Sequence, residues 1–66
     1  MEYTREDLAE AKRQIDSTLH KLRETIGTFQ SKENPDRYKS QITLAKRRTK
    51  AFELAVFLIE RELTRH

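Results

Sequence analysis

The sequence predicts an all-α fold, an antiparallel two-helix hairpin of the coiled-coil kind, from three observations. Charged residues make up 38% of its 66 residues, with one glycine and one proline, a composition typical of long solvated helices. Two long segments each carry apolar residues at steps of three and four, which is the spacing of one helix face. One short turn separates the two segments. We therefore expect a single helical-hairpin domain over residues 1–66.

The first helix is expected over residues 4–31, and its start carries two separate signals. Thr4 is a favoured N-cap residue, and Asp7 three positions later can complete a capping box. Tyr3 and Leu8 occupy the two positions of a hydrophobic staple. Both signals place the beginning of the helix at Thr4.

An apolar seam follows along this helix. Because Phe29 keeps the phase of the seam beyond Gly27, we expect the helix to continue through this glycine to about Ser31. The seam comprises Leu8, Ala11, Ile15, Leu19, Leu22, Ile26 and Phe29.

The second helix is expected from Pro35 to about Thr64, after a turn at residues 32–35. Asn34 is suited to cap this helix, and Pro35 is favoured at the first helical position. The apolar seam of this helix has an unbroken heptad spacing. It comprises Tyr38, Ile42, Ala45, Thr49, Phe52, Val56, Ile59 and Leu63.

The two seams fit each other in an antiparallel arrangement. In such a hairpin, residues that face each other have position numbers with a constant sum, and here every layer gives 67 or 68. Leu22 opposite Ala45 also sets a small residue against a larger one. This match of all layers predicts an αα-hairpin in which the two seams form the core.

A second apolar surface lies on the other side of the second helix. From residue 51 to residue 59 only Glu53 is not apolar, whereas a surface helix normally has one apolar stripe. A chain this short usually needs disulfides, a metal or oligomerisation, and it has no cysteine. We expect a homodimer that forms a four-helix bundle, with a different protein partner, a larger oligomer or a monomer as alternatives. The interface would comprise Leu44, Ala51, Leu54, Ala55, Phe57 and Leu58.

Basic residues gather in the first half of the second helix. In one interpretation they bind nucleic-acid phosphates. In the other, which we favour, they form a solvated face that pairs with acids of the first helix such as Asp16 and Glu24. Four of the bases fall within five positions and wrap around the helix, and no aromatic residues interleave with them as in a single-strand platform. The cluster comprises Arg37, Lys39, Lys46, Arg47, Arg48 and Lys50.

The sequence carries no pattern that predicts catalysis or a cofactor. His20 has Asp16 and Glu24 four positions away on either side, a spacing that can bind a metal in bundle cores. These three residues flank the seam instead of filling it, and no fourth ligand is at hand. Glu62 and His66 repeat the spacing at the end of the helix. We expect no enzyme activity and no metal or cofactor.

Membrane association is not expected. No run of about 18 apolar residues exists, and the first eight residues are polar and acidic, unlike a signal peptide. A basic amphipathic helix that lies on a membrane surface is an alternative. We do not favour it, because the apolar part of this helix belongs to a hairpin whose other face is already specified by the seam. The lack of cysteine is compatible with a reducing cytosol, so we expect a cytoplasmic protein.

These features predict a small non-catalytic interaction or regulatory protein that associates with itself, with a nucleic-acid-binding hairpin as the alternative. In length and expected architecture the chain resembles the small dimeric helical-hairpin bundles of the ROP kind, one of which binds RNA. The resemblance extends to no sequence motif, so it assigns no binding residues.

Overall fold

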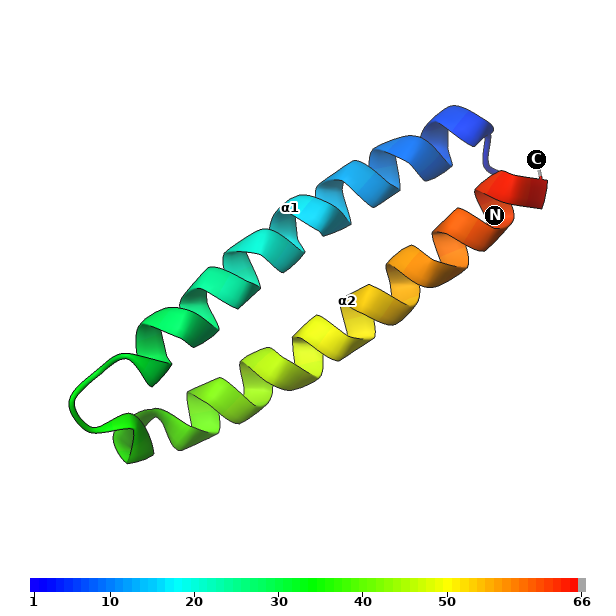
Figure 1. The fold of residues 1–66 in the computed structure, drawn as a ribbon. Helices are drawn as coiled ribbons and strands as arrows, with labels where there is room; N and C mark the ends of the chain where they lie inside the picture. The colour runs from blue at the N-terminus through cyan, green and yellow to red at the C-terminus, as the bar shows by residue number, and fades with distance from the viewer. Residues whose placement is uncertain (66) are drawn as a thin grey trace.

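The computed structural model describes residues 1–65, apart from the side chain of Pro35. Helix α1 (Arg5–Gln30) is followed by a 3₁₀ turn, η1 (Pro35–Tyr38), and by helix α2 (Lys39–Arg65). The two long helices lie side by side and run antiparallel, with the turn at one end of the rod and both termini at the other (Figure 1). The predicted all-α hairpin is confirmed.

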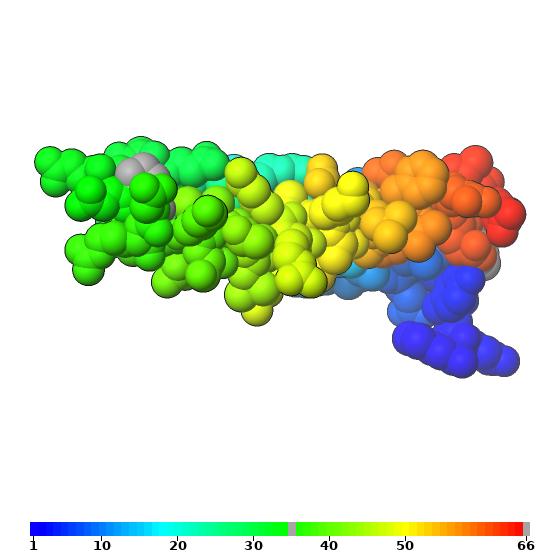
Figure 2. All heavy atoms as spheres, turned by 90° about the horizontal axis from the view of Figure 1, so that it is seen from below, coloured from blue at the N-terminus to red at the C-terminus, as the bar shows by residue number. Residues whose placement is uncertain are grey.

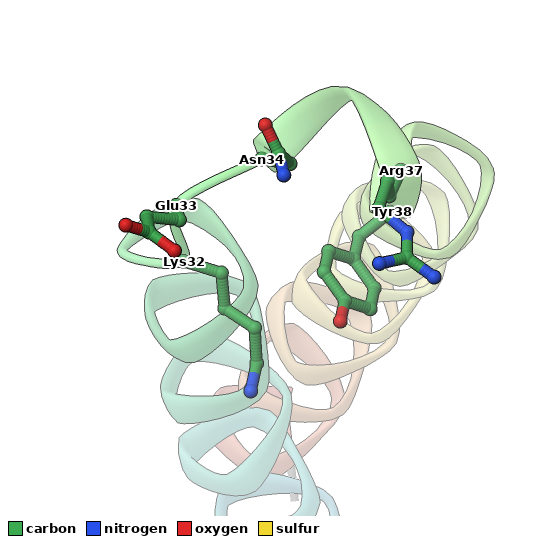
Figure 3. A pocket seen from close by; sticks show the side chains of 5 residues that line it. All are labelled: Lys32, Glu33, Asn34, Arg37 and Tyr38. Atoms are coloured by element: carbon green, nitrogen blue, oxygen red, sulfur yellow. The ribbon is translucent and has the colours of Figure 1, made fainter.

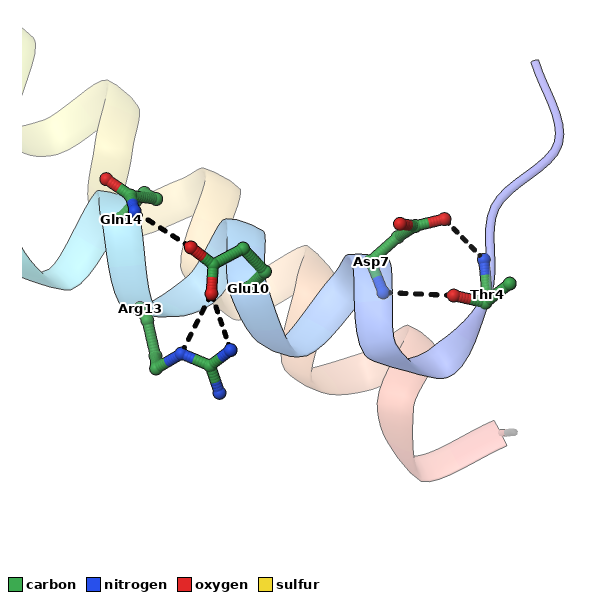
Figure 4. Close-up of polar contacts among 5 residues, drawn as sticks. All are labelled: Thr4, Asp7, Glu10, Arg13 and Gln14. Carbon is green, nitrogen blue, oxygen red and sulfur yellow. Dashed lines mark hydrogen bonds and ion pairs between the residues drawn. The ribbon is translucent and has the colours of Figure 1, made fainter.

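The start of α1 has the capping box that the sequence predicts. The Asp7 backbone N–H donates to Thr4 Oγ1 at 3.1 Å, and the Thr4 N–H donates to Asp7 Oδ2 at 2.9 Å (Figure 4). One turn later, hydrogen bonds from Gln14 and then Arg13 hold the pKa of the Glu10 carboxyl below its ordinary value. The capping box satisfies backbone donors that have no partner within the helix.

The other end of α1 also follows the prediction closely. The helix passes through Gly27 without a positive φ and ends at Gln30, with Ser31 as its C-cap. The Ser31 N–H donates to the Gly27 carbonyl at 3.1 Å, and its hydroxyl donates to the Thr28 carbonyl at 2.9 Å. The seam therefore continues unbroken to Phe29.

The start of the second helix differs from the expectation. Asn34 makes no side-chain capping bond, and the α-helix begins at Lys39, not at Pro35. The intervening 3₁₀ turn is tighter than an α-helical turn. It brings the Tyr38 ring onto the Phe29 ring, with centroids 5.0 Å apart and planes 24° from parallel. The stacked rings fill the layer of the seam that lies nearest the turn.

The seams form the core, as predicted. Every predicted seam residue of both helices is buried or half-buried. Leu19 at 3% and Ala45 at 7% exposure are the only residues in the described part of the chain that are buried and not half-buried or exposed. The one polar seam residue, Thr49, donates its hydroxyl to the Ala45 carbonyl at 2.9 Å, so that no polar hydrogen is left without an acceptor in the seam.

At the open end of the rod, the residues before and at the start of α1 bind the end of α2. The Tyr3 hydroxyl donates to Glu62 Oε1 at 2.8 Å, and this bond raises the pKa of Tyr3 above its ordinary value. Arg5 donates to the Leu63 backbone carbonyl at 2.8 Å. That carbonyl belongs to the last turn of α2, where carbonyls have no partner within the helix.

The hairpin is a rod with much exposed surface. Its radius of gyration is 15.0 Å and its extents are 48 × 18 × 15 Å, whereas a compact domain of this length has a radius of about 11 Å. Its accessible surface is 5490 Å², against about 4400 Å² for a compact monomer of the same mass. No helix within residues 1–65 is long and apolar enough to cross a membrane.

Candidate interaction surface on the second helix

The six residues predicted for an interface lie on the side of α2 that faces away from α1, and we call them the apolar back of α2. Figure 2 views the hairpin from the α2 side. The four large side chains are about half-exposed: Leu44 at 48%, Leu54 at 58%, Phe57 at 56% and Leu58 at 50%. Ala51 is exposed, and Ala55 is half-buried at the edge next to the seam. The hairpin itself therefore leaves this surface in contact with water.

The spacing within the apolar back suits contact with another helix. Leu44, Ala51 and Leu58 are seven residues apart and so lie nearly in one line along α2. The alanine in the middle presents a small side chain, and helix axes approach more closely where the contact residues are small. The two leucines would then pack on either side of the point of closest approach.

The charged residues around the apolar back are basic. Arg47, Lys50, Arg61 and Arg65 lie on the same side of α2, and all four are exposed. Glu62 lies at the edge of this side, where it accepts the hydrogen bond from Tyr3. A partner of the apolar back therefore meets an apolar centre between cations.

The predicted basic cluster is exposed, and the expectation that it pairs with acids of the first helix is wrong. Asp16 binds Lys12 Nζ at 2.9 Å, and Glu24 Oε1 lies 2.8 Å from His20 Nε2. Each acid thus has a partner four residues away on its own helix, which is closer at hand than α2. No ion pair among residues 1–65 involves Arg37, Lys39, Lys46, Arg47, Arg48 or Lys50.

The ion pairs between the helices run in the opposite sense, from bases of α1 to acids of α2. Arg23 lies 3.3 Å from Glu53, and Lys12 lies 3.7 Å from Glu60. Lys12 also binds Asp16, and that hydrogen bond is the main cause that raises the pKa of Lys12. Glu53 and Glu60 of α2 are therefore paired with bases of α1, while the basic cluster of η1 and α2 is left to solvent.

Two hollows lie near the basic cluster. One, of about 340 Å³, is lined by Lys39, Ser40, Thr43, Leu44 and Arg47 on α2. The other, of about 400 Å³, lies at the turn and is lined by Lys32, Glu33, Asn34, Arg37 and Tyr38 (Figure 3). There Lys32 Nζ is 5.8 Å from the centre of the Tyr38 ring, and Glu33 points away from that ring.

The three residues whose spacing could bind a metal, His20, Asp16 and Glu24, have different partners in the structure. His20 lies next to Glu24, but Asp16 is bound to Lys12. No group of three metal-ligating side chains occurs among the described residues. His66 lies outside the described residues.

Neither a protein-family model, nor a curated protein, nor a solved structure matches this chain. The resemblance to ROP-like hairpins thus stays one of length and architecture. Two surfaces of the chain are candidates for a function: the apolar back of α2 and the basic cluster, which begins at Arg37 in η1 and continues along α2.

Proposed function

We propose that this chain is a small, non-catalytic interaction or regulatory protein of the cytoplasm that associates with a second copy of itself through α2. The product is a four-helix bundle with the two α2 helices at its centre. The observation that carries the proposal is the apolar back of α2, whose four large side chains are about half-exposed although the seam is already filled. Monomeric proteins rarely expose a contiguous apolar patch of this kind.

The surface area of the hairpin supports the same proposal. The chain exposes roughly 1100 Å² more than a compact monomer of its mass. A stable interface of ordinary size covers about 800 Å² on each partner. A second copy laid along the apolar back would remove most of the excess.

The test is the mass of the chain in solution between about 1 and 100 µM, a range in which a modest dimer dissociates. Light scattering or sedimentation equilibrium is required, because a 48 Å rod elutes anomalously from a sizing column. We expect twice the chain mass of 7.9 kDa, and a thermal midpoint that rises with concentration. A mass of 7.9 kDa across the whole range would contradict the proposal.

A second candidate function is binding of nucleic-acid phosphates by the basic cluster. It is favoured by one observation: all six of its side chains are exposed and have no ion-pair partner among residues 1–65. Such contacts release counterions, so the affinity falls steeply as salt rises.

Retention of the chain on immobilised RNA, measured against salt, tests this second function. The variant Arg47→Glu/Arg48→Glu should lose retention. The control Arg61→Glu/Arg65→Glu makes the same change in net charge near the other end of α2 and should keep most of it. Equal loss of retention in both variants would indicate that binding depends on net charge only. Weak retention of the wild type would rule out this second function.

A further inference from the structure

Folding makes the hairpin electrically polar along its axis. The layer of Leu19 and Thr49 divides the rod into a turn half, residues 20–48, and an open half that contains both termini. The turn half has eight bases and three acids, a net charge of +5 with histidines neutral. The open half has six bases and eight acids, a net charge of −2. The two ends of one rod thus have opposite signs.

From this polarity we infer that the two copies pair antiparallel, with the turn half of each along the open half of the other. The inference rests on the proposed self-association and adds its orientation. In an antiparallel pair, the turn half of each copy (+5) lies beside the open half of the other (−2). In a parallel pair, the two turn halves, each of charge +5, lie beside each other. Like charges brought together oppose association, while complementary halves favour it and fix its register.

The cations around the apolar back are separated only in part by the same orientation. In a parallel pair, Arg47, Lys50, Arg61 and Arg65 would each lie against the same residue of the second copy. In an antiparallel pair centred on Ala51, Arg47 lies opposite Ala55 of the second copy and Arg61 opposite Gln41. Arg47 is then clear of cations, whereas Lys50 still lies about 3 Å along the axis from Lys50 of the second copy, Arg61 lies two positions from the level of Lys39, and Arg65 lies opposite Arg37.

The line formed by Leu44, Ala51 and Leu58 pairs with itself in this register. Leu44 and Leu58 each lie seven residues from Ala51, so an antiparallel pair sets Leu44 of one copy against Leu58 of the other. Ala51 meets its own counterpart at the centre. Because Ala51 lies near the middle of α2 (Lys39–Arg65), the two helices overlap along almost their whole length. The apolar contacts form in either orientation, and the charges select between them.

Disulfide trapping tests the orientation, since the chain has no cysteine of its own. Leu44→Cys and Leu58→Cys are mixed in equal amounts, oxidised, and the products are identified by mass. We expect the mixed 44–58 disulfide to predominate. In an antiparallel pair the two copies of residue 44 are about 21 Å apart along the axis, far beyond the roughly 4.4–6.8 Å that a disulfide allows between Cα atoms. Predominance of the 44–44 and 58–58 products would overturn the inference.

A second measurement leaves the apolar back unchanged. A spin label at Glu33→Cys, in the exposed turn, reports how far apart the turns of the two copies lie. We expect roughly 45 Å in an antiparallel pair, against about 20 Å or less if the turns lie together. A short distance in a protein of dimeric mass would overturn the orientation while self-association stands. A monomeric mass without a label–label distance would overturn both.

Discussion

Leu19→Ala is expected to lower the free energy of unfolding by about 3 kcal/mol, the largest loss from a single truncation in this chain. Leu19 is the most buried residue described, at 3% exposure, and it lies midway along the seam. Truncation of a buried leucine loses its transfer free energy and leaves a cavity that the neighbours fill only partly. A core of this size rarely supplies more than about 3–5 kcal/mol, so a large fraction of the variant should be unfolded.

Urea unfolding followed by far-UV circular dichroism checks this prediction at equal protein concentrations. The matched control is Leu19→Met, which keeps the volume at the same site and should lose less than about 1.5 kcal/mol. If Leu19→Ala is too unstable to measure, both are compared in a Gly27→Ala background. A Cβ at Gly27 meets nothing within 4 Å, and alanine in a helix interior adds about 1 kcal/mol. Equal losses for the two Leu19 variants would show that the seam is not the core.

The hairpin was predictable from the sequence because its determinants are local or periodic. The Thr4–Asp7 capping box needs only residues three apart, and the two seams need only a regular spacing. The stack of Phe29 on Tyr38 follows from the register of those seams. Each is fixed by helix geometry, and no distant part of the chain has to be known.

The features that were missed depend on competition between several partners. The signals at Asn34 and Pro35 suit an α-helix and a 3₁₀ turn alike, and closure of a short turn decides between them. Asp16 could pair with a base of either helix, and the closer Lys12 on its own helix prevails. The sequence also identified the apolar back of α2, but the polarity of the rod emerges only once the two chain halves are folded together.

Leu54→Lys/Leu58→Lys is expected to abolish self-association at concentrations where the wild type is dimeric. The two leucines are 58% and 50% exposed in the hairpin, so the change should leave the seam intact. In the dimer, however, it would place four ammonium groups among apolar side chains and beside cations already present. Burial of an unpaired charge costs several kcal/mol. We expect the dissociation constant to rise at least about 100-fold, which corresponds to roughly 2.8 kcal/mol.

The control Ser17→Lys/Thr28→Lys adds the same two charges at exposed positions of α1 and should stay dimeric. Light scattering gives the mass of each variant, and circular dichroism shows whether the helices persist. If Leu54→Lys/Leu58→Lys is monomeric and keeps its helices, the hairpin folds without its partner. If it loses them, folding and association are a single step, as the small core suggests. Dimers in both variants would place the interface elsewhere, and dissociation of both would point to added charge instead of lost apolar contact.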